Sequence, residues 1–189
     1  KEFKLITKKI INTVEALLFG AGRPLRLSEI KALLEIDFGQ LELSTIKIAL
    51  NNLEERYIES SLELQEVASG YRIQVKQDFS PCLSSLWTDK SNKLSKSLME
   101  TISIIAYKQP VTRGDIEDIR GVSVSTQTVR SLLEREWIKI SGYRDVPGRP
   151  ALYSTTHNFL NDFNIKKISE LPPLPDLEEV AEDFSLQAI

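Results

Sequence analysis

The sequence predicts an α+β protein built from two tandem winged helix-turn-helix domains, mostly helical with small β-hairpin wings. The first observation is the order of elements in residues 113–156, where two short helical patterns precede two β-rich runs around a polar turn at 145–149. Helix, turn, helix and hairpin is the order of a winged helix-turn-helix. The second observation is that the same order occurs earlier, between residues 16 and 75.

The repeat is clearest where each first helix ends. Residues 16–30 align without gaps on residues 102–116. The matched pairs are Pro24 with Pro110, Leu25 with Val111, Glu29 with Asp115, and Ile30 with Ile116. Each copy is an apolar helix, a turn stopped by proline, and a second helix, because proline lacks the N–H that would continue the helical ladder.

The first copy opens with a helix whose apolar residues recur at helical spacing. This stripe consists of Ile10, Ile11, Val14, Leu17 and Leu18, and such a pattern predicts one buried face. The stripe contains more apolar residues than the core of so small a domain needs. We therefore expect it to leave apolar surface for a second copy of the chain and to form the dimer interface. The copy closes with a hairpin over residues 62–75.

The second copy has stronger helix-start signals. The expected helices cover 113–120 and 125–136, the hairpin covers 138–156, and a further helix begins at His157. Serine, threonine and aspartate side chains can accept hydrogen bonds from the free N–H groups of a first turn. The expected caps are Thr112 with Asp115 in a capping box, Ser125 or Thr126, and Thr155 or Thr156.

Composition divides the chain into four parts. We expect a first winged-helix domain at 1–80 that dimerises, a linker at 81–92, a second winged-helix domain at 93–165, and a mobile acidic tail at 166–189. The linker has polar ends and contains Pro81, and the tail carries seven acidic and two basic residues from position 161 onward. At 189 residues, the chain is long enough for two modest cores.

Charge and residue types narrow the function. Residues 81–160 carry eleven basic and eight acidic side chains, whereas residues 1–80 carry eleven and twelve. This mild positive balance predicts weak autonomous DNA binding, because DNA affinity depends on neutralising phosphates. His157 and Cys82 are the only residues of their kinds, too few for a structural zinc site. No phosphate-binding glycine loop occurs, so we expect no enzyme activity and no cofactor.

The apolar runs and the cysteine content of the chain bear on its location. No run approaches the roughly 18 apolar residues that a membrane helix needs, and the single cysteine excludes a disulfide within the chain. Both observations favour a cytoplasmic protein.

Four side chains of the second domain are candidates for contact with a partner: Tyr107, Arg113, Arg130 and Arg149. Tyrosine and arginine are frequent interface anchors, because each combines a large stem with a directional polar tip. In the alternative interpretation, these side chains have roles within the chain's own fold. Tyr107 packs against its own wing, Arg113 pairs with a nearby acid, and Arg149 supports the wing turn together with Arg144.

Several segments resemble one known family. Residues 62–72, 104–113, 119–122 and 145–156, with the trailing segments Phe159–Phe163 and 171–174, are similar to segregation and condensation protein B. Ser69 before Gly70 departs from the two glycines that this family often has there. The resemblance implies a bacterial cytoplasmic homodimer associated with the nucleoid. It also implies a non-catalytic accessory subunit of the SMC condensin complex, bound to the kleisin subunit, segregation and condensation protein A, and through it to SMC.

The runner-up hypothesis is a DNA-binding transcription regulator, for which a doubled winged helix is equally suitable. A regulator should carry arginine and lysine beside its third helix, and these are sparse here. An enzyme, the third class, would need residues that the chain lacks.

Overall fold

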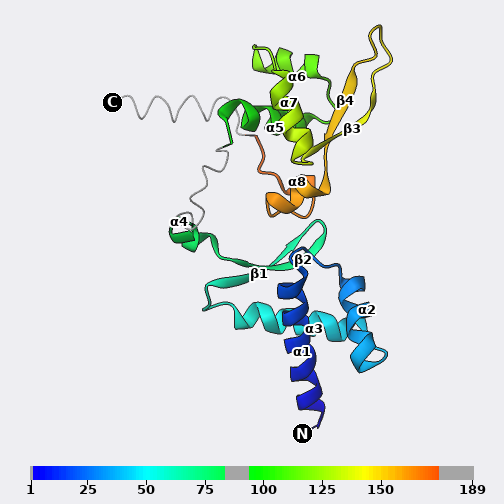
Figure 1. Cartoon of the computed structure of the whole chain (residues 1–189), viewed down its shortest axis with the longest axis vertical. Coiled ribbons are helices and arrows are strands. Elements are labelled where there is room, and N and C mark those ends of the chain that lie inside the picture. The colour runs from blue at the N-terminus through cyan, green and yellow to red at the C-terminus, as the bar shows by residue number, and fades with distance from the viewer. Residues whose placement is uncertain (1, 84–93, 175–189) are drawn as a thin grey trace.

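The computed structural model describes residues 2–83 and 94–174, with the side chains of residues 2–6 left out. Two winged-helix units follow one another along the chain (Figure 1). The elements of the first are α1 (Glu2–Ala21), α2 (Leu27–Phe38), α3 (Leu43–Arg56), β1 (Leu62–Val67) and β2 (Gly70–Val75). The elements of the second are α5 (Lys96–Lys108), α6 (Arg113–Arg120), α7 (Thr126–Glu134), β3 (Ile138–Tyr143), β4 (Ala151–Thr155) and α8 (His157–Asp162).

The connecting elements are short. The 3-10 turn η1 (Gln77–Phe79) and the helix α4 (Ser80–Leu83) follow the first wing, and the 3-10 turn η2 (Ile168–Glu170) follows α8. The expected linker therefore begins with a helical turn, and the rest of it up to residue 92 lies outside the described residues.

Each wing is an antiparallel hairpin. In each unit, one residue from the connection between the first and second helices pairs with the second strand of the wing. Leu25 bridges to Tyr71 in the first unit, and Val111 bridges to Tyr153 in the second. Leu25 N donates to Tyr71 O at 2.9 Å and Tyr71 N returns a bond to Leu25 O at 2.8 Å. Leu25 and Val111 are the pair that the sequence repeat superimposes, so the alignment is confirmed by equivalent backbone pairing.

The expected helix caps of the second unit are present. Thr112 Oγ1 accepts from Asp115 N, and Asp115 Oδ2 accepts from Thr112 N, which completes a capping box at α6. Ser125 and Thr156 cap α7 and α8. The predicted helix 125–136 ends two residues early, because Glu136 takes a left-handed backbone conformation with a φ of 55°.

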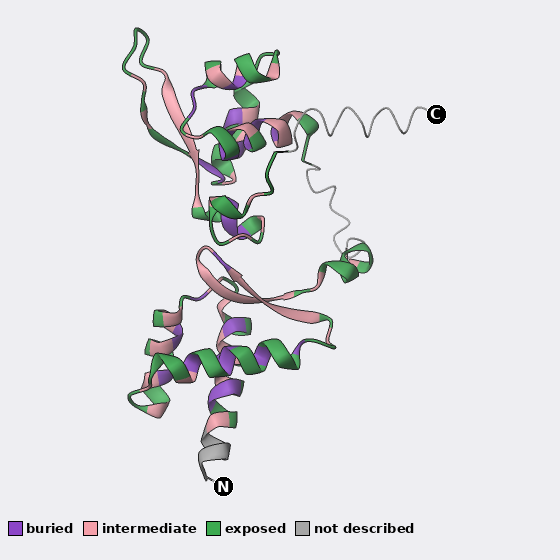
Figure 2. Ribbon diagram, turned by 180° about the vertical axis from the view of Figure 1, so that it is seen from behind, coloured by how far each residue is buried: buried purple, intermediate pink, exposed green. Residues whose placement is uncertain are grey.

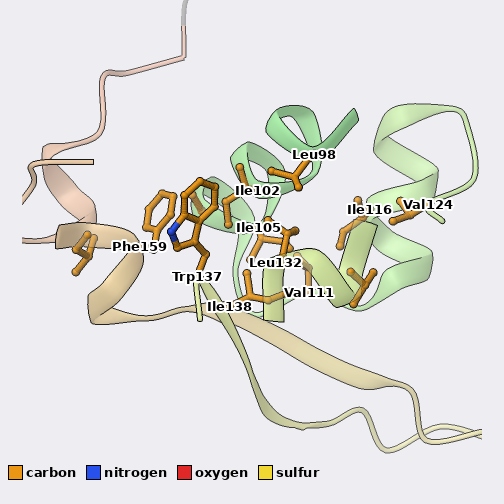
Figure 3. Close-up of a cluster of buried hydrophobic side chains, with 13 residues drawn as sticks. Leu98, Ile102, Ile105, Val111, Ile116, Val124, Leu132, Trp137, Ile138 and Phe159 are labelled. Carbon is orange, nitrogen blue, oxygen red and sulfur yellow. The ribbon is translucent and has the colours of Figure 1, made fainter. Parts of the chain in front are cut away.

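Each unit has its own apolar core (Figure 2). In the first, the buried stripe of α1 packs on α2 and α3. In the second, side chains from α5, α6 and α7 converge with Trp137 and Ile138 at the base of the wing and Phe159 of α8 (Figure 3). Trp137 Nε1 also donates to Asp162 Oδ2 at 2.7 Å, so the wing base and α8 are joined by a polar contact as well as by packing.

The first wing contacts the second unit. The turn between β1 and β2 meets the end of α8, where Ser69 N donates to Asn161 Oδ1 at 3.1 Å and Asn161 Nδ2 donates to Ser69 Oγ at 2.9 Å. Ala68 N donates to Ile165 O at 3.2 Å. Arg72 Nη2 donates to Asn161 O at 2.9 Å and to Asn164 Oδ1 at 2.5 Å. These bonds connect the turn and strand of the first wing to the end of α8 and the segment after it.

The second domain extends beyond residue 165, where the sequence predicts a mobile tail. Ile168 and Leu171 pack against the second core, and Lys166 Nζ forms an ion pair with Glu66 of the first wing. The apolar side chains at 168 and 171 are removed from water by this packing, which stabilises the stretch on the domain despite its charged neighbours. The boundary therefore lies past Leu171, and residues 175–189 lie outside the described residues.

Candidate partner-binding surface

The helix-turn-helix of the second unit presents the two predicted arginines on its outer side. Arg113 begins α6, and its Nε donates to Glu117 Oε1 at 3.0 Å. Arg130 lies midway along α7, and its Nε donates to Glu134 Oε1 at 2.7 Å. Both are pairs four residues apart on one helix face. Each guanidinium already has a carboxylate beside it, so this face offers little free positive charge to a phosphate backbone.

Glu117 accepts two hydrogen bonds through the same carboxylate oxygen. Its Oε1 also accepts from Val124 N at 2.8 Å, and this backbone bond, followed by the bond from Arg113, lowers the pKa of the Glu117 carboxyl. Arg113 Nη1 lies 3.5 Å from Thr126 Oγ1 at the start of α7. Arg113 therefore spans the turn between α6 and α7. Arg113 thus pairs with a nearby acid, as the alternative interpretation of this residue expects.

Tyr107 lies in the last turn of α5 and is 37% exposed. Its hydroxyl donates to the carbonyl oxygen of Pro172 at 2.6 Å, so its polar tip is used by the segment that follows α8 and not by the wing. The exposed part of the side chain remains accessible to a partner. No contact joins Tyr107 to Arg113 or Arg130 among the described residues.

Arg149 lies in the connection between β3 and β4, at the far end of the projecting second wing (Figure 1). Its backbone adopts a φ of 40°, and its N–H donates to Val146 O at 2.9 Å. The turn geometry explains Gly148 as well, since its φ of 86° is disfavoured for residues with a Cβ. The second wing therefore places Arg149 well away from α8.

Arg144, by contrast, is fixed against the helix-turn-helix. Its Nη1 and Nη2 donate to Asp115 Oδ1 and Oδ2 at 2.8 and 2.6 Å. The Arg144 guanidinium and the backbone N–H of Thr112 together lower the pKa of Asp115 to about 2. One carboxylate thus caps α6 and anchors the wing. Sequence spacing alone carries no signal for this pair, because the partners are 29 residues apart.

The residues predicted for the dimer interface occupy the interior of the first unit. Ile10, Ile11, Val14 and Leu18 are buried, and Leu17 is partly buried against the same core. Within the single chain they leave little surface for a second copy. The exposed apolar side chains of this unit lie elsewhere, with Ile36 of α2 78% exposed and Ile48 of α3 54% exposed.

No group of three or more histidine, cysteine, aspartate or glutamate side chains able to hold a metal ion occurs in the ranges 2–83 and 94–174. Within those ranges, no helix combines the length and the apolar character required to span a bilayer.

Comparison with known proteins places the chain in a family. The family model described as segregation and condensation complex subunit ScpB matches residues 12–174. A segregation and condensation protein B homolog from Coxiella burnetii is 45% identical, over 96% of this chain and 87% of that protein. Segregation and condensation protein B from Bacillus subtilis is 41% identical, over 88% of this chain and 83% of that protein.

Among solved structures, a dimer of the ScpB N-terminal domain complexed with a ScpA peptide is 29% identical. It covers 42% of this chain and 95% of its own, with a TM-score of 0.38. The sequence matches, which span almost the whole chain, show that it belongs to the segregation and condensation protein B family.

Proposed function

We propose that this chain is a non-catalytic accessory subunit of the SMC–kleisin condensin complex, which acts in the cytoplasm at the nucleoid. In this proposal it supports chromosome condensation and segregation by binding the kleisin subunit. Membership of the ScpB family carries the proposal. The mild charge balance of residues 81–160, with eleven basic and eight acidic side chains, supports it over a DNA-binding regulator, because DNA affinity depends on neutralising many phosphates.

The kleisin contact is assigned to the outer side of the second domain. Tyr107 offers a partly exposed aromatic side chain, and Arg113 and Arg130 offer exposed guanidinium groups. Arg149 extends the surface along the wing. A partner that replaces Glu134 at Arg130 would gain a charge-assisted bond without leaving a buried charge unpaired.

The test is the affinity of a kleisin fragment for Tyr107→Ala and Arg130→Glu variants of the full chain. Each substitution should weaken binding by at least about tenfold, as expected for interface anchors. Lys96→Glu is the matched control, since Lys96 is 93% exposed in its side chain and begins α5 of the same domain. Thermal melting checks folding. Unchanged affinity in both well-folded variants would rule this surface out.

We also propose that the first domain forms the homodimer, now through its exposed apolar side chains. Ile36 and Ile48 are large and solvent-exposed, and burying them against a second copy would remove apolar surface from water. Sedimentation of the full chain should show a dimer that Ile36→Glu and Ile48→Glu weaken. Ile119→Glu on α6, also at an exposed isoleucine, should leave the dimer intact. A dimer insensitive to both first-domain changes contradicts this placement.

A further inference from the structure

A groove of about 760 Å³ lies on the second domain, bounded by the end of α7, the base of the second wing, α8 and the segment after α8. It is distinct from the helix-turn-helix arginines and from Tyr107. Its lining includes four aliphatic side chains, Leu133, Ile138, Leu160 and Ile168. Leu133 is 37% exposed, so part of this apolar lining faces solvent.

The remaining lining of the groove is polar, and three of its four charged side chains are basic. Lys139, Lys166 and Lys167 contribute three ammonium groups, and the single acid in the lining is Glu136. Glu136 Oε2 is occupied by Asn158 Nδ2 at 2.6 Å, and Lys166 is paired with Glu66. Lys139 and Lys167 form no ion pair within residues 2–83 and 94–174. The groove therefore combines an apolar lining with two available cations.

Such a groove fits an acidic peptide that also carries apolar side chains. A nucleic-acid backbone would use the lysines but not the aliphatic lining. Residues 175–189 of this chain have the complementary composition, with five acidic and no basic residues. Within them, Leu177, Val180 and Phe184 recur at intervals of three and four, so one short segment supplies both kinds of group.

The segment begins close to the groove. Ile168 lines it, and six further residues lead to Leu174. Residue 175 is seven residues after Ile168, and seven residues span at most about 25 Å, so residue 175 starts within that distance of Ile168. Tethering at this range gives a local concentration on the order of millimolar, which makes even a weak contact populated.

We propose that the groove docks residues 175–189 of the same chain. The carboxylates of this segment meet Lys139 and Lys167, and its apolar side chains cover Leu133 and Ile168. This inference holds whether or not the chain binds a kleisin.

The experiment uses the full chain with Phe184→p-benzoylphenylalanine, irradiated and mapped by mass spectrometry. Equal amounts of ordinary and ¹⁵N-labelled chains are mixed, so that cross-links within one chain are told apart from those between chains. We expect cross-links within one chain to Leu133 or Ile168. The double variant Lys139→Glu/Lys167→Glu should lower their yield about tenfold, since each exposed ion pair contributes modestly.

Lys96→Glu is the control, because it reverses an exposed charge away from the groove, and it should leave the yield unchanged. Both lysines of the double variant are exposed, so circular dichroism should show an unaltered fold. Higher salt should reduce the yield by screening. Cross-links chiefly between chains, cross-links outside the groove, or a yield unaffected by the double variant would overturn the proposal.

Discussion

Gly70 at the turn of the first wing is the position where a single methyl group should have the largest effect. Its φ is 129°, and an added Cβ would lie 2.2 Å from the carbonyl oxygen of Leu25. That oxygen accepts the hydrogen bond from Tyr71 N. The substitution Gly70→Ala must therefore push Leu25 away from the wing, and neither backbone segment is a flexible side chain that can rotate aside.

The expected cost has two parts. A residue with a Cβ forced into this backbone region costs about 1–3 kcal/mol. Losing the two bonds between Leu25 and Tyr71 costs about 0.5–1.5 kcal/mol each. Together these give roughly 2–6 kcal/mol of lost stability in the first domain. The wing turn would also shift away from Asn161, which loosens the contact between the domains.

Chemical denaturation measures the change in the free energy of unfolding, and hydrogen exchange of the Leu25 and Tyr71 amides locates it. Gly142→Ala is the matched control. Gly142 is also in a wing strand, but its φ is not positive and nothing lies within 4 Å of an added Cβ. The control should change stability by less than about 0.5 kcal/mol. If Gly70→Ala were as mild as Gly142→Ala, with both amides still protected, the steric reasoning would be refuted.

Three further results are expected. Asn161→Ala removes both bonds to Ser69, so the Ala68 and Ser69 amides should exchange faster while Leu25 stays protected; unchanged exchange would show that the domains are not held there. Asp115 has a lowered pKa, so its pairing stabilises the fold above the ordinary carboxyl pKa and is lost as pH falls from about 4 to about 2. Arg144→Gln should flatten the dependence of the unfolding midpoint on pH in that window, and parallel curves for the two proteins would contradict the assignment. DNA binding by the isolated chain should be weak with a shallow salt dependence, and sub-micromolar binding to one duplex at physiological salt would restore the regulator hypothesis.

Local signals in the sequence were sufficient for the helix starts of the second domain. Thr112 with Asp115, Ser125 and Thr156 cap helices through bonds to residues three positions away, so a short window contains both partners. The repeat also matched Leu25 to Val111, which pair equivalently with the two wings. Family membership followed from several short segments in a fixed order along one chain.

The tertiary structure decided which surfaces remain available. Ser69 and Asn161 are 92 residues apart, and Arg144 reaches Asp115 across 29, so neither pair follows from local spacing. The sequence shows that the stripe on α1 is apolar, but only its packing on α2 and α3 shows that it is buried inside the first domain. The sequence predicts that Ile168 and Leu171 belong to a charged tail, whereas in the structure they pack against the second core. The sequence determines which residues avoid water, because that depends on each side chain. Which partner covers them depends on where the whole chain brings other apolar groups.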